Sequence, residues 1–189
     1  TEKIRQGLED LNFIDVAFEM EFRRLEQYTA SGFDEAEFMI STNPGMPVRP
    51  LGMVASGGEL SRIMLAIKAV LADTDDIPTL IFDEIDTGIS GRTAQKVSEK
   101  LSYIARNHQV ICITHLPQIA AMADTHFEIA KSAAAGSTTT TIHPLCGDEM
   151  VKELARLLGG AKITDAVYDN AREMKVLADQ SKLYKTVNN

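Results

Sequence analysis

The sequence predicts an α/β fold whose core is a mostly parallel sheet with flanking helices, preceded by an antiparallel N-terminal strand pair. Two apolar runs, at Thr79–Phe82 and at residues 110–114, are too short for helices and have the composition of buried strands. Between them, residues 92–106 repeat apolar side chains at a helical period. A strand, a helix and a strand of these lengths form a right-handed βαβ unit, so the two strands run parallel.

Length and composition indicate a soluble globular protein with one core. The 189 residues fit one ordinary domain, and 44% apolar with 24% charged residues is typical of such chains. No apolar run approaches the roughly 18 residues of a membrane span, so we expect no membrane partner. The two cysteines, Cys112 and Cys146, imply no disulfide framework and indicate a reducing cytoplasm.

The charge balance argues against a basic surface for nucleic acid. The formal net charge is −8, and lysine and arginine are scattered along the chain. If the whole protein binds DNA, we expect other segments to supply most of the affinity. The spacing of cysteine and histidine also argues against a zinc site, because no C-x-x-C or H-x-x-x-H pair occurs.

The N-terminal quarter predicts a helix followed by a hairpin. Residues 1–11 repeat apolar side chains on one helical face, which fits either the foot of a coiled coil or an ordinary amphipathic helix. Residues 13–25 and 35–42 alternate in part between apolar and polar side chains, so we expect two antiparallel strands. The proline-rich stretch 43–50 then predicts an irregular loop.

A helix of about four turns is expected to begin near Ser56 or Gly57, because apolar residues recur after it at a helical period. Ser56 and Glu59 match a capping box, which accounts for these two residues structurally. Gly57 and Gly58 weaken a first helical turn, but they let an anion approach bare N–H groups at the positive end of the helix. We therefore favour phosphate binding over capping alone.

Charged side chains follow both predicted parallel strands. Asp83 and Glu84 come directly after Thr79–Phe82, where open α/β sheets bind ligands. Such a pair can hold Mg²⁺ and polarise a water, although a solvated charged turn would have the same sequence. His115 follows the second strand, so we expect it at the same edge of the sheet. Taken singly, His115 also fits a strand-end histidine bonded to the backbone, and Asp86 fits a turn former.

The remaining third of the chain predicts helices and a hairpin at the edge of the sheet. A short helix is expected over residues 117–122, because proline suits a first helical turn. Residues 127–143 have the pattern of an antiparallel hairpin. Two further amphipathic helices are expected over residues 148–158 and 164–181, with a frayed tail from Lys182.

These motifs, in this order, resemble the C-terminal half of an ATP-binding-cassette ATPase head. Residues 56–59 are similar to the signature motif of that family, and residues 79–84 to its Walker B strand with the following glutamate. Asp86 lies in a stretch similar to the D-loop, and His115 matches the switch histidine. Within the superfamily, the agreement is densest with bacterial DNA-repair ATPases related to the SMC proteins, over three stretches: 54–62, 82–91 and 114–118.

The resemblance implies an ATP hydrolase, and it implies a role for each of these residues. Asp83 would hold Mg²⁺ through a water, Glu84 would deprotonate the attacking water, and His115 would sense the γ-phosphate. ATP would join two heads and hydrolysis would release them. The nucleotide of one head would meet this set of residues on the other: Ser56, Gly57, Gly58, Glu59 and Asp86.

The sequence holds no phosphate loop of the form G-x-x-x-x-G-K-[ST]. In the proteins that it resembles, that loop lies in the N-terminal half of the head, and a long coiled coil separates the halves. We therefore expect residues 1–11 to be the end of a coiled coil or amphipathic helix, and residues 12–189 to be the C-terminal half of the head. We also expect this chain to be inactive by itself.

The partners implied by the resemblance are a second copy of the head, the N-terminal half of the same head, and DNA bound through the full-length protein near the bacterial nucleoid. Two other readings fit the fold. A nucleotide-binding subunit of a membrane transporter is disfavoured by Glu59, where transporters usually carry glutamine. A non-catalytic dimerisation module is disfavoured by the presence of both Glu84 and His115.

Overall fold

The computed structural model of the chain describes residues 1–43, 45–54, 56–134, 137–160 and 162–187. The chain divides into two compact units, Thr1–Ile113 and Thr114–Asn189. The boundary between the two units falls directly after the second parallel strand, and the assignment of residues 12–189 to half of a head stays a prediction.

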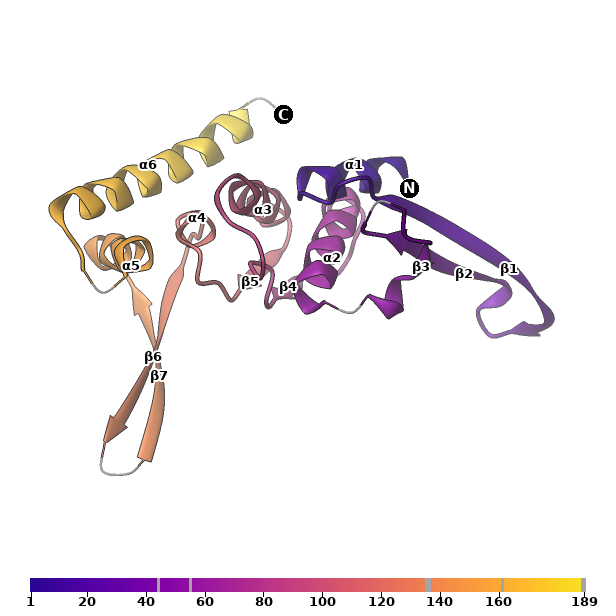
Figure 1. Ribbon diagram of the computed structural model, residues 1–189, viewed down its shortest axis with the longest axis horizontal. Helices are drawn as coiled ribbons and strands as arrows, with labels where there is room; N and C mark the ends of the chain where they lie inside the picture. The colour runs from indigo at the N-terminus through magenta and orange to yellow at the C-terminus, as the bar shows by residue number, and fades with distance from the viewer. Residues whose placement is uncertain (44, 55, 135–136, 161, 188–189) are drawn as a thin grey trace. The chain divides into compact units, whose positions relative to one another are not determined.

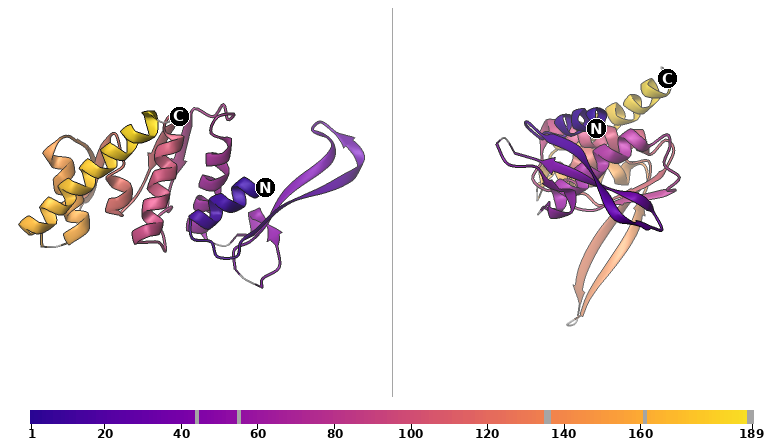
Figure 2. Two further views of the ribbon diagram at one scale, coloured as in Figure 1. Left: turned by 90° about the horizontal axis from the view of Figure 1, so that it is seen from above. Right: turned by 90° about the vertical axis from the view of Figure 1, so that its right-hand side faces the viewer.

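The first unit begins with helix α1 (Glu2–Asp10) and a long antiparallel ribbon (Figures 1 and 2). The ribbon consists of β1 (Ala17–Thr29) and β2 (Gly32–Ser41), so the predicted hairpin is confirmed, with its first strand beginning at Ala17 instead of residue 13 and its second at Gly32 instead of residue 35. The stretch predicted to be irregular contains a short third strand, β3 (Arg49–Pro50), which pairs with β2. The 3₁₀ turn Leu51–Met53 follows it.

Helix α2 (Gly57–Leu71) follows with the start and length that the sequence predicted. It packs against α1 and α3, and its buried face is continuous with the apolar core of the unit. The largest fully buried side chains of this core are Leu8, Leu11, Ile63, Leu65, Ile85, Val97 and Ile104. α1 packs on α2 at Gly7, where a Cβ would lie in ordinary van der Waals contact, 3.5 Å from the Cβ of Ala66.

The predicted βαβ unit is confirmed. Strand β4 (Thr79–Phe82) pairs in parallel with β5 (Gln109–Cys112), and helix α3 (Gly91–Ile104) connects them. Within the described residues this parallel sheet has two strands. The carboxyl ends of both strands therefore lie at one edge, where Phe82 is the partner of Cys112.

The prediction that these strands are buried holds for Phe82 but is wrong for the isoleucines. Phe82 is 5% exposed, but Ile81 is 69% exposed, and Ile111 and Ile113 are exposed as well. Because alternate residues of a strand point to opposite faces, these isoleucines share one face of the sheet. An apolar run in the sequence indicates a strand with apolar side chains. It does not show whether another element covers each face of that strand.

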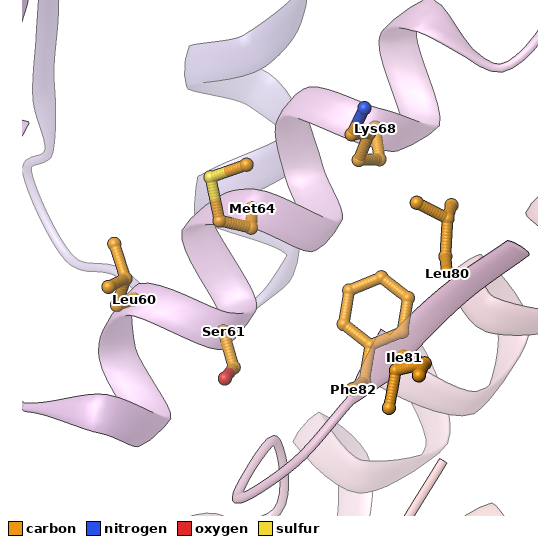
Figure 3. Close-up of a pocket in the computed structure, with 7 residues that line it drawn as sticks. All are labelled: Leu60, Ser61, Met64, Lys68, Leu80, Ile81 and Phe82. Carbon is orange, nitrogen blue, oxygen red and sulfur yellow. The ribbon is translucent and has the colours of Figure 1, made fainter. Parts of the chain in front are cut away.

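A mostly apolar pocket of about 280 Å³ lies between α2 and β4 (Figure 3). Its walls come from residues of both elements: Leu60, Ser61, Met64, Lys68, Leu80, Ile81 and Phe82. The pocket begins one turn after the start of α2, so it adjoins the glycine-bearing end of the helix.

In the second unit, the described residues form a hairpin and helices that Figure 1 labels α4, α5 and α6. Its elements in order are α4 (Pro117–Ala120), β6 (His126–Ala134), β7 (Ser137–Leu145), α5 (Asp148–Gly159) and α6 (Asp165–Val187). Helices α5 and α6 lie side by side, and a small core forms where they meet α4. The buried members of this core are Ala120, Ala121, Leu154, Ala155 and Ala171.

Two predictions for this unit need correction. Among the described residues, the hairpin β6–β7 forms a separate two-stranded sheet, whereas the sequence predicted it at the edge of the parallel sheet. The tail from Lys182 was expected to fray, but α6 continues to Val187, with Lys182 paired to Asp124 and Asp179. The predicted hairpin over residues 127–143 includes residues 135–136, which lie outside the described residues. None of the described helices has the length and apolar character that a membrane crossing requires.

Candidate functional site

Ser56 occupies the N-cap position of α2, in an extended conformation with φ −100° and ψ 123°. Its hydroxyl oxygen accepts a hydrogen bond of 3.4 Å from the backbone N–H of Glu59. This confirms one half of the predicted capping box. Gly57 and Gly58 are the first two helical residues, and the first N–H groups of a helix lack intrahelical partners. The start of α2 is therefore built as an anion site requires.

The acidic pair stands at the carboxyl end of β4. Asp83 and Glu84 are both exposed, and Asp83 Oδ1 accepts a 2.9 Å hydrogen bond from the Glu84 backbone N–H. The turn closes where the N–H of Thr87 donates to the Glu84 carbonyl at 3.1 Å. Asp86 and Ile85 point inward, and Asp86 is 4% exposed. The turn thus divides its acidic residues between solvent and interior.

Glu84 has a left-handed backbone, with φ +55°. For a residue with a Cβ this conformation costs about 1–2 kcal/mol, so the surrounding structure must hold it. Two side chains of α2 donate hydrogen bonds to the backbone carbonyls at the two ends of this turn, those of Asp83 and Thr87. Ser61 Oγ donates to the Asp83 carbonyl at 2.8 Å, and Arg62 Nη1 donates to the Thr87 carbonyl at 2.8 Å.

The start of α2 lies directly against this turn. A Cβ on Gly57 would come within 2.5 Å of Glu84 Oε2. A Cβ on Gly58 would come within 2.9 Å of Thr87 Cβ and 3.0 Å of the Glu84 carbonyl oxygen. The sequence suggested that the glycines leave room for an anion, and the structure adds a second reason, because the protein's own turn needs that room.

Cys112 lies at the same end of the sheet. The neighbouring backbone continues the parallel pairing, since the N–H of Ile113 donates to the Phe82 carbonyl at 3.0 Å. Burial, together with the nearby charges of Asp86 and Asp83, raises the pKa of the Cys112 thiol to about 12. The thiol stays protonated at neutral pH, so it is no nucleophile in this site.

His115 belongs to the second unit and is exposed. It comes three residues after the end of β5, and the N–H of Leu116 donates to Thr114 Oγ1 at 3.0 Å beside it. The structure therefore brings together Ser56–Glu59, Asp83, Glu84 and Asp86 within the first unit. That His115 joins them at one edge stays a prediction.

The donor set at this edge suits Mg²⁺. Among the described residues, no three His, Cys, Asp or Glu side chains gather as ligands around one ion would. Mg²⁺ does not need such a cage, because it keeps several waters and is held by one or two carboxylates together with phosphate oxygens. An exposed Asp83 at the strand end fits that mode of binding.

Sequence reasoning missed Ser61 and Arg62. Both stand in the stretch 54–62 that resembled the ATPase family, of which Ala55 lies outside the described residues. The helical pattern gave one indication that Arg62 is buried. Arg62 shares the buried helix face of Gly58 and Ala66, which lie four residues before and after it. A charged residue on a buried face is paired with something, but the partner cannot be named from the helix.

No protein-family model matches the chain. The chain is 44% identical over 186 residues to the DNA repair protein RecN of Halalkalibacterium halodurans, covering 96% of this chain and 33% of that protein. It is 51% identical over 156 residues to the DNA repair protein RecN of Bacillus subtilis, covering 82% and 27%. It is 43% identical over 176 residues to that of Vibrio cholerae, covering 93% and 32%. The chain thus spans about a third of the length of these relatives.

Among solved structures, the fold is similar to that of an Smc head domain with a coiled coil and joint from Pyrococcus yayanosii. The TM-score is 0.55 at 22% identity, and the match covers 81% of this chain and 28% of that one. This likeness bears on the fold, and it agrees with the α/β class that the sequence predicted.

Proposed function

Since this chain is the C-terminal part of a RecN-type protein with the fold of an SMC ATPase head, we propose that it supplies half of an ATP-hydrolysing head. The observation that carries the proposal is the exposed Asp83–Glu84 pair, which stands at the carboxyl end of a parallel strand. The relatives are DNA repair proteins. We therefore assign the whole protein to the repair of DNA double-strand breaks and to recombination, in the bacterial cytoplasm at the nucleoid.

Glu84 is the general base in this proposal. Its carboxylate would orient and deprotonate the water that attacks the γ-phosphate, a role worth about 10²–10⁴ in rate. Asp83 would hold Mg²⁺, which supplies charge neutralisation to the phosphates. The hydrogen bond from the Glu84 N–H to Asp83 Oδ1 supports this division, because it orients the Asp83 carboxylate relative to its neighbour.

The start of α2 receives the nucleotide of a second copy of the head. Ser56, Gly57 and Gly58 would offer N–H groups and a hydroxyl to the γ-phosphate, and Glu59 would complete the motif. Asp86 would act from the adjoining turn. His115 would act with Glu84, sensing the γ-phosphate of the nucleotide that Glu84 hydrolyses. ATP then stabilises a dimer of heads, and hydrolysis releases it.

The N-terminal half of the same head is the second partner. The phosphate loop, which this sequence lacks, would come from that half. The apolar isoleucine face of β4–β5 supports the assignment, because parallel sheets are normally covered on both faces. This chain by itself would then hold half of each site, and it would not hydrolyse ATP.

Two alternatives have less support. A transporter subunit would need a membrane partner, and the relatives are DNA repair proteins. A non-catalytic dimerisation module would not need a carboxylate held in a left-handed conformation at a strand end.

The substitution Glu84→Gln in the full-length protein tests the proposal. It keeps the shape of the side chain but removes the base, so ATP hydrolysis should fall at least a hundredfold while ATP-stabilised dimers persist. Size-exclusion chromatography with light scattering, with and without Mg-ATP, measures the dimers. Glu35→Gln, on the exposed face of β2, is the matched control. Unchanged hydrolysis in Glu84→Gln would remove Glu84 from the role of base.

A further inference from the structure

The buried arginine of α2, Arg62, has none of the nucleotide-binding, metal-binding or catalytic roles proposed for this site. Arg62 is 9% exposed, and burial lowers the pKa of its guanidinium. Among the described residues, its Nε is buried and has no hydrogen-bond partner. Burying a guanidinium this incompletely satisfied is unfavourable, so its position calls for a reason beyond packing.

One end of the Arg62 side chain reaches the Glu84 turn, the stretch from Asp83 to Thr87. Nη1 donates to the Thr87 carbonyl at 2.8 Å, and the N–H of Thr87 donates to the Glu84 carbonyl at 3.1 Å. Arg62 is therefore one backbone hydrogen bond away from the residue with the left-handed conformation. Together with Ser61, which binds the Asp83 carbonyl, it fixes both ends of the Glu84 turn to one rigid helix.

The guanidinium also faces the end of the N-terminal helix. Its Cζ lies 5.5 Å from the centre of the Phe13 ring, a distance at which a cation is attracted to an aromatic face. Phe13 is buried, and its N–H donates to the Leu8 carbonyl of α1 at 3.2 Å. A change in the position of α1 therefore reaches Phe13 directly.

The same side chains line a pocket of about 230 Å³. Its walls are Asn12, Phe13, Ile14, Thr42, Asn43, Glu59 and Arg62. The space lies where the residues after α1, the end of β2 and the first turns of α2 come together. Arg62 has room on this side, so a shift of Phe13 can move it without disrupting the core.

We propose that Arg62 is a positioning residue that holds the Glu84 turn in its working conformation and links that turn to the end of α1 through Phe13. The inference rests on the proposed function, because it gives Glu84 the role of base. It adds a route by which an element attached to α1 would influence hydrolysis.

The test uses ATP hydrolysis by the full-length protein with Arg62→Met, Arg62→Lys and the matched control Arg106→Met. Arg106 is exposed at the end of α3, where its side chain lies over Tyr103. Arg62→Met should lower kcat about tenfold to a hundredfold with KM for ATP changed less than about threefold, because the turn is misplaced but the phosphate contacts remain. Arg62→Lys should recover most of the rate, since its ammonium can also donate to the Thr87 carbonyl. Arg106→Met should match the wild type.

A double-mutant cycle separates positioning from a general structural effect. If Arg62 acts through Glu84, Arg62→Met in a Glu84→Gln background should cause no further loss of the residual rate. An equal fractional loss in both backgrounds, or a wild-type kcat in Arg62→Met, overturns the inference. Should Arg62→Met fail to fold, Phe13→Leu replaces it, because it keeps an apolar side chain but removes the ring face. Its kcat should fall at constant KM, and an unchanged kcat overturns the link to α1.

The outcome for Glu84→Gln keeps the two proposals distinct. If that variant hydrolyses ATP at the wild-type rate, the proposed function fails whatever Arg62 does. If it loses activity while Arg62→Met does not, the proposed function stands and only the role of Arg62 fails.

Discussion

The Glu84 carboxylate lies against Gly57 at the start of α2, so closely that a Cβ on Gly57 would come within 2.5 Å of Glu84 Oε2. Two motifs that are 27 residues apart in the sequence, from residue 57 to residue 84, thus meet on one surface of one unit. Because Gly57 and Gly58 both lie against the turn that contains Glu84, substituting either glycine should have a measurable effect.

Substituting Gly57 should separate activity from stability. The atom that an alanine would meet is the far end of the flexible Glu84 side chain, so the carboxylate moves aside and the fold persists. We expect Gly57→Ala in the full-length protein to lose at least tenfold in ATP hydrolysis, with little change in melting temperature. Gly52→Ala is the control, because nothing lies within 4 Å of a Cβ there.

Gly58→Ala should behave differently from its neighbour. Its Cβ would meet Thr87 Cβ and the backbone oxygens of Glu84 and Thr87, which cannot swing away. Overpacking of this kind costs about 1–3 kcal/mol, so thermal unfolding should begin at a lower temperature than in Gly57→Ala. Equal melting temperatures for the two variants would contradict the packing described for this turn.

His108 should make stability depend on pH. Its ring nitrogens lie 2.7 Å from the Ile77 carbonyl oxygen and 2.9 Å from that of Ala72, and these two hydrogen bonds raise the pKa of the imidazole above 6.5. Because the folded-state pKa is the higher one, the stabilisation is complete below 6.5 and is lost as pH rises through the folded-state pKa. Between about pH 6 and pH 8, the melting temperature of the wild type should therefore fall further than that of His108→Gln. Parallel pH profiles would contradict this.

The two cysteines should react at very different rates. Burial raises the pKa of Cys112 to about 12, whereas Cys146 is exposed. Iodoacetamide attacks the thiolate, so at about pH 8 it should modify Cys146 first and leave Cys112 until the protein unfolds. Peptide mass spectrometry after timed labelling measures both. Rapid labelling of Cys112 in the folded protein would show that the end of β5 is more open than described.

The parts of the fold that could be predicted are those with a local cause. The period of apolar residues in α2 and α3, the breaker before β4 and the capping Ser56 each act within a few residues, and those elements begin where the sequence indicated. The parallel direction of β4 and β5 followed from the length of the crossover between them.

What could not be predicted depends on contacts between distant residues. Arg62 and Thr87 are 25 positions apart, and no pattern within α2 names the carbonyl that Arg62 binds. Nothing in the local sequence indicates the left-handed backbone of Glu84, because glutamate rarely adopts that conformation. Likewise, Ile81 has the sequence of a buried residue, and its exposure depends on which elements cover the sheet.

The central claim is that each ATP site is shared between two copies, with Glu84 from one and Ser56–Gly58 from the other. Mixing two inactive full-length variants, Glu84→Gln and Ser56→Arg, tests it most directly. In a mixed dimer one site would carry both changes and the other neither, so hydrolysis should recover to about a quarter of the wild-type rate. If the start of α2 and Glu84 served one site within a single copy, every site would carry one change. The mixture would then stay as inactive as its components, and the account would be contradicted.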